Sequence, residues 1–588
     1  MWHCGGRTGA LPGWRPPPKI ATQARTRTMQ PNSPPQLLEI ALDCARRGDF
    51  AGMAEICRGL LRTDPNQPDA LHCMGLFHRR SGDIAACVDC HERSVKGRPN
   101  NPEYRNALGL AYRAANRNAD AVDAFETAIR LDPSFTDAYV NVGQVHFARG
   151  EFRNAVTRFR DAIERKPTVA LLHVALGRGL AAQGDSRGAE ASFRRALTLE
   201  GGAGAAWSGL GDLFLASGDT SRALDAFKDG IEADPNDPGN CLRAVPLLVK
   251  LDRIDEAIEL LQEALKRTPG IAVMHVALAR LLMRQERWQE CWPHYERRLH
   301  IPPLSNARHR FVQPLWDGGN PKGLRLCVHF EHSLAESLAL LRYLEPLSDA
   351  GAEIVLLCPA LIRATLAPLG PRITVCGPND SLPPFDRHVW LASLPLLLER
   401  PDPSQLPATP QGLEMLADSA QWRHRCESLP RPLVGLHWRS PSGSSVFADA
   451  RSLLSAFSTF RGGLIALQDR TAAADIAEAG MVDRMVHVGD ELVGNADIGC
   501  AIAEAIAQCD LVVSVDSPVV QTAGLLRRPT LALIDGGEAF PWPLDRLETG
   551  WFPTVGILRR HPGNDDATFI GRIRQAIDSF AENTATAI

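Results

Sequence analysis

The sequence predicts an all-α array of helical repeats followed by an α/β half that contains parallel sheets. Two observations support this fold class. Small residues, aromatic residues and prolines recur every 34 residues through the N-terminal half, and short apolar runs alternate with helical stretches after Pro303. A fixed period of this length is typical of a helical solenoid, and strand–helix alternation is typical of parallel α/β units. The 588 residues suit two to four domains.

Composition narrows the classes of partner. The chain is 45% apolar and 22% charged, and its formal net charge of −4 gives no reason to expect nucleic acid or an anionic membrane surface. No apolar run approaches the roughly 18 residues of a membrane-spanning helix. The 14 cysteines follow no disulfide framework, which fits a reducing compartment, and we expect a cytoplasmic protein.

The N-terminal residues have a basic composition of their own. Five Lys or Arg residues precede the first acidic residue, Glu39, and there is no apolar core typical of a secretory signal. An organellar transit peptide is one interpretation. We favour the other, in which Met29 is the true start and residues 1–33 are a disordered or misassigned extension.

The 34-residue period is clearest in three residue types. One position of the repeat is glycine in successive units, a second position is phenylalanine, and a third position, at the end of each unit, is proline. The positions are Pro65, Pro99, Pro133, Pro167, Pro235, Pro269 and Pro303, with Gly201 between the fourth and fifth; Gly75, Gly109, Gly143, Gly177 and Gly211; and Phe125, Phe159, Phe193 and Phe227. Small residues let the two helices of a hairpin approach, the aromatic ring fills the groove between them, and proline ends the second helix.

These positions resemble the tetratricopeptide repeat (TPR). Eight units run in register over residues 34–305. The resemblance implies an array that presents a concave surface to a peptide or protein segment, although the sequence does not name that partner.

Cys87, Cys90 and His91 match the haem-attachment pattern C-x-x-C-H. The repeat register gives another interpretation, in which Cys87 occupies the small-residue slot of a second helix and His91 occupies the aromatic slot. Both side chains would then face the interior of the hairpin. We favour this structural interpretation.

The C-terminal half contains two sets of strand-like runs. The first set covers 324–330, 353–359 and 372–377, and the second covers 432–438, 464–468, 485–489, 511–516 and 529–534. Helical stretches separate several of them, which predicts two Rossmann-like halves with a ligand cleft at the carboxyl ends of the strands. We expect a linker at 306–322, a first lobe at 323–430 and a second lobe at 431–588.

Several stretches in this half resemble the glycosyltransferase domain found behind bacterial TPR arrays, which is related to heptosyltransferases and has a two-lobed B-type fold. The stretches are Leu315–Gly318, His329–Glu331, Arg342–Tyr343, Phe385–Asp386, Ser393–Pro395, Val434–Trp438, Leu467–Gln468, Cys509–Asp516, Ala523–Gly524, Trp542–Leu544 and Trp551–Pro553. The resemblance implies inverting, metal-independent transfer of a sugar from a nucleotide sugar to a protein or glycan acceptor, with no other cofactor.

The resemblance also implies functional residues, and the chain departs from the family at two of the loops. The family's G-L-G-D run reads Ser333-Leu334-Ala335-Glu336 here, which makes Glu336 the expected general base with one extra methylene. The family's D-T-A-x-x-H reads Asp516-Ser517-Pro518-Val519-Val520-Gln521, so a neutral glutamine replaces histidine.

Two further observations complete the expected donor site. Pro518 is suited to a first helical turn, so free N–H groups of that turn could meet a diphosphate. Arg439 follows a strand and opens a Gly/Ser-rich loop at 440–445, and its fork matches phosphate oxygens. The expected phosphate-binding residues are Arg439, Ser517, Gln521 and Thr522.

Three functions remain open from the sequence. The first is an active glycosyltransferase with an acceptor held by the repeats. The second is a catalytically impaired glycosyltransferase fold in a TPR interaction scaffold, because two functional loops have diverged while the strands are kept. The third is nucleotide binding without transfer.

Overall fold

A computed structural model describes residues 34–199, 204–307, 311–331, 333–413, 419–439, 450–468, 473–488, 498–534, 542–543, 547–560 and 565–585. The expected N-terminal extension, 1–33, lies outside these ranges. Contacts divide the chain into two compact units, Met1–Leu213 and Phe214–Ile588, which are described separately below. Within the described residues, no helix combines the length and the apolarity needed to cross a bilayer.

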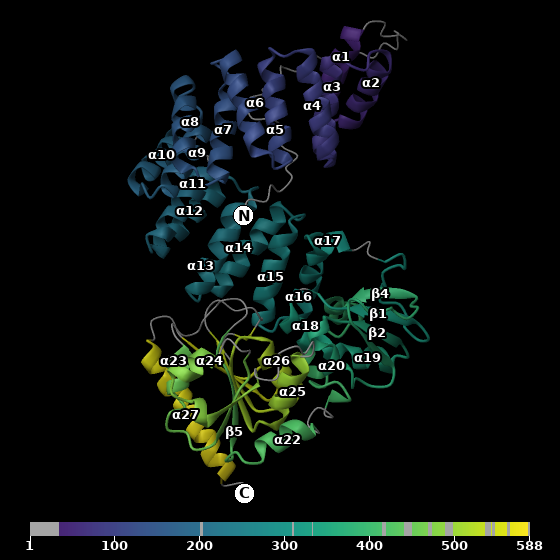
Figure 1. The fold of residues 1–588 in the computed structure, drawn as a ribbon, viewed down its shortest axis with the longest axis vertical. Helices are drawn as coiled ribbons and strands as arrows, with labels where there is room; N and C mark the ends of the chain where they lie inside the picture. The colour runs from purple at the N-terminus through teal and green to yellow at the C-terminus, as the bar shows by residue number, and fades with distance from the viewer. Residues whose placement is uncertain are drawn as a thin grey trace. The chain divides into compact units, whose positions relative to one another are not determined.

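The first unit consists of paired antiparallel helices (Figure 1). In each pair the two helices are of similar length and a short turn joins them. They are α1 (Pro34–Arg46), α2 (Phe50–Thr63), α3 (Pro68–Ser81), α4 (Ile84–Gly97), α5 (Pro102–Ala114), α6 (Asn118–Leu131), α7 (Thr136–Ala148), α8 (Phe152–Arg165), α9 (Ala170–Ala182) and α10 (Ser186–Leu199). The next helix, α11 (Gly204–Ala216), contains the boundary between the two units.

The residues of the 34-residue period hold each pair together as expected. A Cβ atom added at Gly143 of α7 would lie 2.5 Å from the ring of Phe159 in α8, so only glycine lets the two helices approach this closely. Gly109 and Phe125 repeat the same contact one unit earlier. Gly82 ends α3 in the left-handed conformation, with a φ of 81°, where glycine carries no steric cost.

The second unit begins with further helical repeats. They are α12 (Thr220–Ala233), α13 (Pro238–Lys250), α14 (Ile254–Arg267), α15 (Ala272–Arg284) and α16 (Trp288–Tyr295). The 3₁₀-helix η1 (Glu296–His300) continues α16, and the short α17 (Leu304–Ala307) follows it. The last repeats therefore belong to the same compact unit as the sheets.

A four-stranded parallel sheet follows, with the order β3-β2-β1-β4. Its strands are β1 (Arg325–His329), β2 (Glu353–Leu357), β3 (Ile373–Cys376) and β4 (Arg387–Trp390). The helices of this segment are α18 (Leu334–Leu340), η2 (Leu341–Tyr343), α19 (Leu344–Asp349), α20 (Ala360–Leu366), η3 (Leu391–Ser393), α21 (Leu394–Leu397) and η4 (Pro403–Gln405). The 3₁₀ turn η2 separates α18 from α19, so the helical stretch after β1 is not one continuous helix.

A second parallel sheet has six strands in the order β10-β9-β8-β5-β6-β7. The strands are β5 (Leu433–His437), β6 (Gly463–Ala466), β7 (Met485–His487), β8 (Leu511–Val515), β9 (Thr530–Ile534) and β10 (Val555–Arg559). The helices are α22 (Ala420–Cys426), α23 (Ala450–Ser455), α24 (Ala473–Glu478), η7 (Val482–Arg484), α25 (Ile498–Gln508), α26 (Pro518–Leu525) and α27 (Asp566–Ala585). Numbered within this sheet, the order is 3-2-1-4-5-6, which is that of doubly wound sheets.

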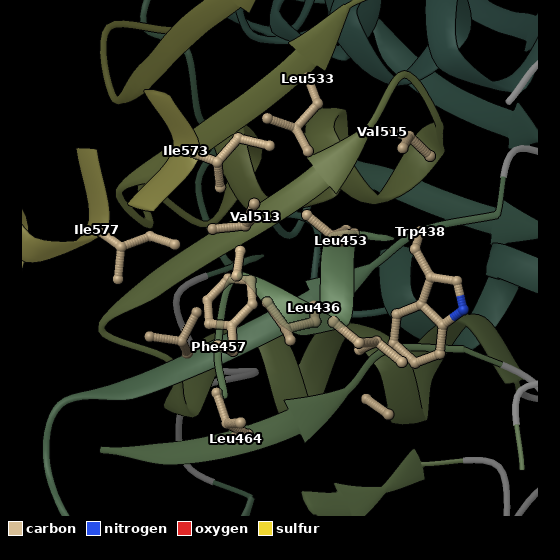
Figure 2. Close-up of a cluster of buried hydrophobic side chains, with 14 of the residues drawn as sticks. Leu436, Trp438, Leu453, Phe457, Leu464, Val513, Val515, Leu533, Ile573 and Ile577 are labelled. Atoms are coloured by element: carbon tan, nitrogen blue, oxygen red, sulfur yellow. The ribbon is translucent and has the colours of Figure 1, made fainter. Parts of the chain in front are cut away.

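Both faces of the six-stranded sheet are covered by apolar side chains. Figure 2 shows one of these cores, where Leu436, Val513 and Leu533 of the strands lie close to Ile573 and Ile577 of α27. On the other face α22, α25 and α26 cover the sheet with a second cluster that includes Trp422. Strands buried on both faces explain the continuous apolar runs in the sequence.

Two strands were not expected from the sequence. β4 contains Arg387 and His388, and β10 is a short run that contains a glycine. Both strands pair with one neighbour only and stand at a sheet edge. The expected domain limits at 305, 322 and 430 stay predictions.

The C-x-x-C-H segment lies in α4 and is buried. Cys87 and His91 are both fully buried, and a Cβ added at Gly75 of α3 would lie 2.5 Å from the His91 ring. His91 therefore occupies the position that phenylalanine holds in the following repeats, which agrees with the structural interpretation. Neither ring nitrogen of His91 has a hydrogen-bond partner among the described residues.

We expect His91 to make the first unit sensitive to acid. Burial, with the nearby His72 and Arg79, lowers the pKa of His91 from 6.5 to about 3. The unfolded chain then binds a proton below pH 6.5 that the folded chain does not, so stability falls as the pH drops from 6.5 towards 3. The loss at pH 5 is about 2 kcal/mol. His91→Phe should raise the thermal midpoint and reduce its pH dependence.

Thermal unfolding followed by circular dichroism between pH 5 and pH 7.5 checks this expectation. His424→Phe is the control, because the side chain of His424 is 86% exposed. Equal pH dependence in wild-type protein and His91→Phe would contradict the assignment.

Candidate functional site

Glu336, the expected general base, lies in the first turn of α18. Ser333 caps this helix, and its Oγ accepts a hydrogen bond of 3.3 Å from the backbone N–H of Glu336. The carboxylate is mostly buried, with its side chain 14% exposed. The local sequence therefore places a carboxylate at a helix N-terminus, where negative charge is favoured.

The carboxylate of Glu336 is bound by two side chains of the last repeat. Arg280 of α15 donates from Nη2 to Oε1 over 2.8 Å, and the hydroxyl of Tyr295 donates to Oε2. Glu336 raises the pKa of Arg280 further above its ordinary value. Burial, together with the charge of Glu336, raises the pKa of Tyr295 well above 10, so Tyr295 stays a donor. Both oxygens of the expected base are thus occupied by partners within the chain.

A second ion pair joins the same two parts of the unit. Arg298 of η1 donates to both oxygens of Glu331, at 2.7 and 2.5 Å, and to Glu296 at 2.8 Å. Its side chain is 5% exposed. Burial lowers the pKa of Arg298, but Glu331 and Glu296 outweigh it, and the pKa is raised. Ser393 of η3 completes the network, accepting from Arg298 and donating to Glu296.

Arg342 links the four-stranded sheet segment to the chain near Trp551. It is almost fully buried and donates to the carbonyl oxygens of Pro403 and Trp551. Burial lowers the pKa of Arg342 to about 10. Trp288 and Trp292 of α16 contact Trp551 with ring centroids 5.1 and 6.5 Å apart. The last repeat, the first sheet segment and the segment before β10 therefore meet at one junction.

Arg439, the expected phosphate-binding cation, follows β5. Its guanidinium forms a two-pronged ion pair with Asp475 of α24 at 2.8 and 2.6 Å, and the Trp438 indole donates to the same carboxylate. The Arg439 guanidinium, whose N–H groups would match phosphate oxygens, is therefore paired with a carboxylate. Residues 440–449, which carry the Gly/Ser-rich loop, lie outside the described residues.

Ser517 caps α26, which begins at Pro518 as the sequence predicts. Its Oγ accepts from the backbone N–H of Val519 at 3.3 Å, and it lies 3.2 Å from Nδ1 of His437 and 3.2 Å from Oγ of Ser514. The sequence reasoning gave no role to His437. A histidine at the carboxyl end of a buried strand, opposite a loop of the neighbouring strand, was the signal that could have identified it.

Gln521 and Thr522 lie in the first two turns of α26 and differ in their contacts. Gln521 is fully buried, and neither its Oε1 nor its Nε2 has a partner in the described part of the chain. The hydroxyl of Thr522 donates to the carbonyl of Pro518 at 2.9 Å. Gln521 is buried and Thr522 is half-buried, and their roles in phosphate binding stay predictions.

An apolar cavity lies between α18, α20, α25 and α26. Its volume is about 90 Å³, and most of the lining is aliphatic. Leu338, Ile362, Ile502, Val519, Leu525 and Leu526 contribute to it. Pockets that hold small-molecule ligands usually have volumes of roughly 300–1,000 Å³. The described residues of this cavity therefore do not provide a nucleotide-sized site. Over the described ranges, no group of three or more His, Cys, Asp or Glu side chains could hold a metal ion.

The geometry and one family model agree on the class of the N-terminal part. The model of the cilia and flagella-associated protein 70 C-terminal domain matches residues 40–300. The chain is a TPR-repeat protein with N-terminal helical repeats, followed by a part with parallel sheets.

Solved structures with similar repeats include a tetratricopeptide repeat protein from Parabacteroides merdae, with 15% identity and a TM-score of 0.36 over 42% of this chain and 98% of that one. A thermophilic TPR protein of Thermus thermophilus has 23% identity and a TM-score of 0.28 over 31% and 99%. Yeast Tom70 has 15% identity and a TM-score of 0.41 over 50% and 65%. No significant match was found among curated proteins.

We expect Arg298→Ala to lower the free energy of unfolding of the second unit by about 3–5 kcal/mol, because it leaves Glu331 buried without its partner. Urea unfolding followed by tryptophan fluorescence measures the change. Arg363→Ala is the matched control, since Arg363 pairs with Asp380 at 2.8 Å on an exposed surface. That change should cost no more than about 1 kcal/mol. If Arg298→Ala lowered the free energy of unfolding by no more than Arg363→Ala does, the Arg298 network would not be important for stability.

Proposed function

We propose that this protein is an interaction scaffold, in which the repeats bind a protein segment and the C-terminal half keeps a glycosyltransferase-like pair of parallel sheets without sugar transfer. The proposal rests on the hydrogen bonds that the Glu336 carboxylate already accepts. Its two oxygens are held by Arg280 and Tyr295 of the last repeat. An acceptor hydroxyl would have to displace one of these side chains before Glu336 could take its proton.

The donor side supports the same proposal. Arg439 is paired with Asp475, and Gln521 is buried in place of a histidine that could carry positive charge. A departing diphosphate needs preorganised positive charge or hydrogen-bond donors aimed at it. Ser517 already caps α26 and lies within hydrogen-bond distance of His437, so a phosphate would have to compete with these contacts.

A second candidate is an active nucleotide-sugar glycosyltransferase with inverting, metal-independent chemistry, as the sequence resemblance implies. One specific observation favours it. His437 and Ser517 meet at the carboxyl ends of β5 and β8, where the first and fourth strands of the 3-2-1-4-5-6 order adjoin. Ligands of doubly wound sheets usually bind at this position. In that case Glu336 acts as the base once Arg280 and Tyr295 are displaced.

Calorimetric titration of the full chain with UDP, GDP, ADP and CMP, and with their sugar conjugates, tests the proposal. We expect no binding below a Kd of about 1 mM, which corresponds to roughly −4 kcal/mol. A donor-hydrolysis assay run beside it should show no turnover.

Micromolar binding of one nucleotide would contradict the scaffold proposal if Arg439→Ala abolished it. Glu336→Gln then separates the remaining functions. Loss of transfer with nucleotide affinity kept would identify a glycosyltransferase, and nucleotide binding without any transfer would identify a nucleotide-binding module.

A further inference from the structure

Two cysteines of the first unit lie on neighbouring hairpins and share one core. Cys57 lies in α2 and Cys73 in α3, and these two helices contact each other. Both thiols are free, and the residues are 0% and 2% exposed. The apolar core around them includes Met53 and Leu60. We call Cys57 and Cys73 the cysteine pair.

The repeat register places the cysteine pair at a point of close contact. Cys57 and Cys73 precede Phe193 and Gly209 by four periods of 34 residues. In the later pair, a Cβ atom added at Gly209 of α11 would overlap the ring of Phe193 in α10. At the same two positions the other units have His91 and Ala107, Phe125 and Asn141, Phe159 and Ala175, and Phe227 and Arg243. The first two hairpins are therefore the place where both positions carry a thiol.

A hydrogen bond between the two thiols makes them chemically unequal. This hydrogen bond, together with burial, raises the pKa of Cys57 far above its ordinary value. The same hydrogen bond lowers the pKa of Cys73, although burial and the charge of Asp69 act in the opposite direction. Because the thiolate is the nucleophilic form of cysteine, Cys73 is the more reactive member of the pair, and Cys57 stays protonated beside it.

The apolar core favours a neutral product of cysteine chemistry at this position. A metal ion would need both thiols deprotonated, which would place negative charge among aliphatic side chains. A disulfide carries no charge, and it requires Cβ atoms about 3.5–4.5 Å apart. Two thiols that already share a hydrogen bond need only small side-chain rotations to reach this geometry.

We propose that the cysteine pair is a redox-sensitive lock, in which hydrogen peroxide oxidises Cys57 and Cys73 to a disulfide that fastens α2 to α3. The disulfide closes a loop that spans the turn between the two hairpins, and such a loop lowers the entropy of the opened chain. This inference goes beyond the scaffold function proposed above, since it concerns the stability of the repeats.

The reaction balances with one peroxide. The Cys73 thiolate attacks one peroxide oxygen and becomes a sulfenic acid, while the other oxygen leaves as hydroxide and takes up the thiol proton to form water. The sulfur of Cys57 then attacks the sulfenic sulfur, the S–S bond forms, and a second water leaves with the proton of Cys57. The two thiols lose two electrons, and the peroxide is reduced to two waters.

Peroxide reaches the cysteine pair when the first hairpin opens. Among the described residues, α1 and α2 are held to the array through their contacts with α3, whereas a hairpin such as α5 and α6 has neighbours on both sides. Local opening of such a unit costs less free energy than global unfolding. Once the disulfide has formed, α2 can no longer separate from α3.

Peptide mapping of the full chain tests the inference. Reduced protein is treated with excess hydrogen peroxide, digested without reductant and analysed by mass spectrometry. We expect a peptide cross-linked between Cys57 and Cys73. Amide hydrogen exchange in α2 should then slow by at least about tenfold, because opening of the hairpin is less favoured. Dithiothreitol should reverse both changes.

Single-cysteine variants assign the two roles. In Cys57→Ala, peroxide should leave Cys73 as a sulfenic acid that dimedone labels, whereas Cys73→Ala should give little label at Cys57. Neither variant should form the cross-link or show the slower exchange. Cys90→Ala is the matched control and should keep both, since Cys90 is a buried cysteine of the same core outside the pair. Circular dichroism of the reduced proteins verifies that all three variants keep their helices.

Three results would overturn the inference. They are a cysteine pair that stays reduced in the wild-type protein, a cross-link that leaves exchange in α2 unchanged, and a Cys90→Ala variant that loses the cross-link as completely as the pair variants do. None of these results bears on the scaffold function, which is decided by the nucleotide titration and the hydrolysis assay.

Discussion

The second unit depends on neutralising one buried cation. Arg298 is almost completely removed from water, and an isolated guanidinium in that position would be strongly unfavourable. Glu331 supplies both of its oxygens, and Glu296 and Ser393 supply the rest. These partners come from the 3₁₀-helix after the last repeat, from the loop after β1 and from the turn after β4. One charge therefore fixes the end of the repeats against the first sheet segment.

The same junction explains why the carboxylate of Glu336 has partners within the chain. Glu336 lies in the first turn of α18, the helix that follows Glu331, so fixing this loop brings the Glu336 carboxylate against Arg280 and Tyr295. The tryptophans of α16 and the buried Arg342 then hold the segment before β10 in the same place. A two-lobed transferase needs room for a donor and movement around it. In this chain, interactions that stabilise the unit take up the groups that such chemistry would use.

The sequence was informative where structure follows from local spacing. The 34-residue period predicted the paired helices because each slot has a fixed packing partner within one hairpin, as Gly143 and Phe159 illustrate. Five strands of the second sheet were predicted because strands covered on both faces are continuously apolar. The strands β4 and β10 were missed because β4 contains Arg387 and His388 and β10 contains Gly556. The edge strands β3 and β7, which are equally short or shorter, were predicted from their apolar runs. The start of α26 at Pro518 was predicted from this proline, which suits a first helical turn.

The contacts of the site were beyond sequence reasoning. Arg280 and Glu336 are 56 residues apart, and Arg439 and Asp475 are 36 apart, so their pairing depends on how whole elements pack. A single sequence shows that Glu336 and Arg439 are charged residues at the ends of strands or helices. It does not show which side chain of opposite charge pairs with each of them in the folded protein.

The division of the chain at Leu213 has a consequence for the number of repeats. Each repeat before that point contacts its neighbours through slots that every unit shares, so duplication or deletion of a 34-residue unit keeps all of those contacts in register. The repeats after that point carry Arg280, Trp288 and Arg298, which have specific partners elsewhere. A change in the number of N-terminal units is therefore compatible with the contacts between repeats, whereas the last repeats depend on partners in the sheet segments.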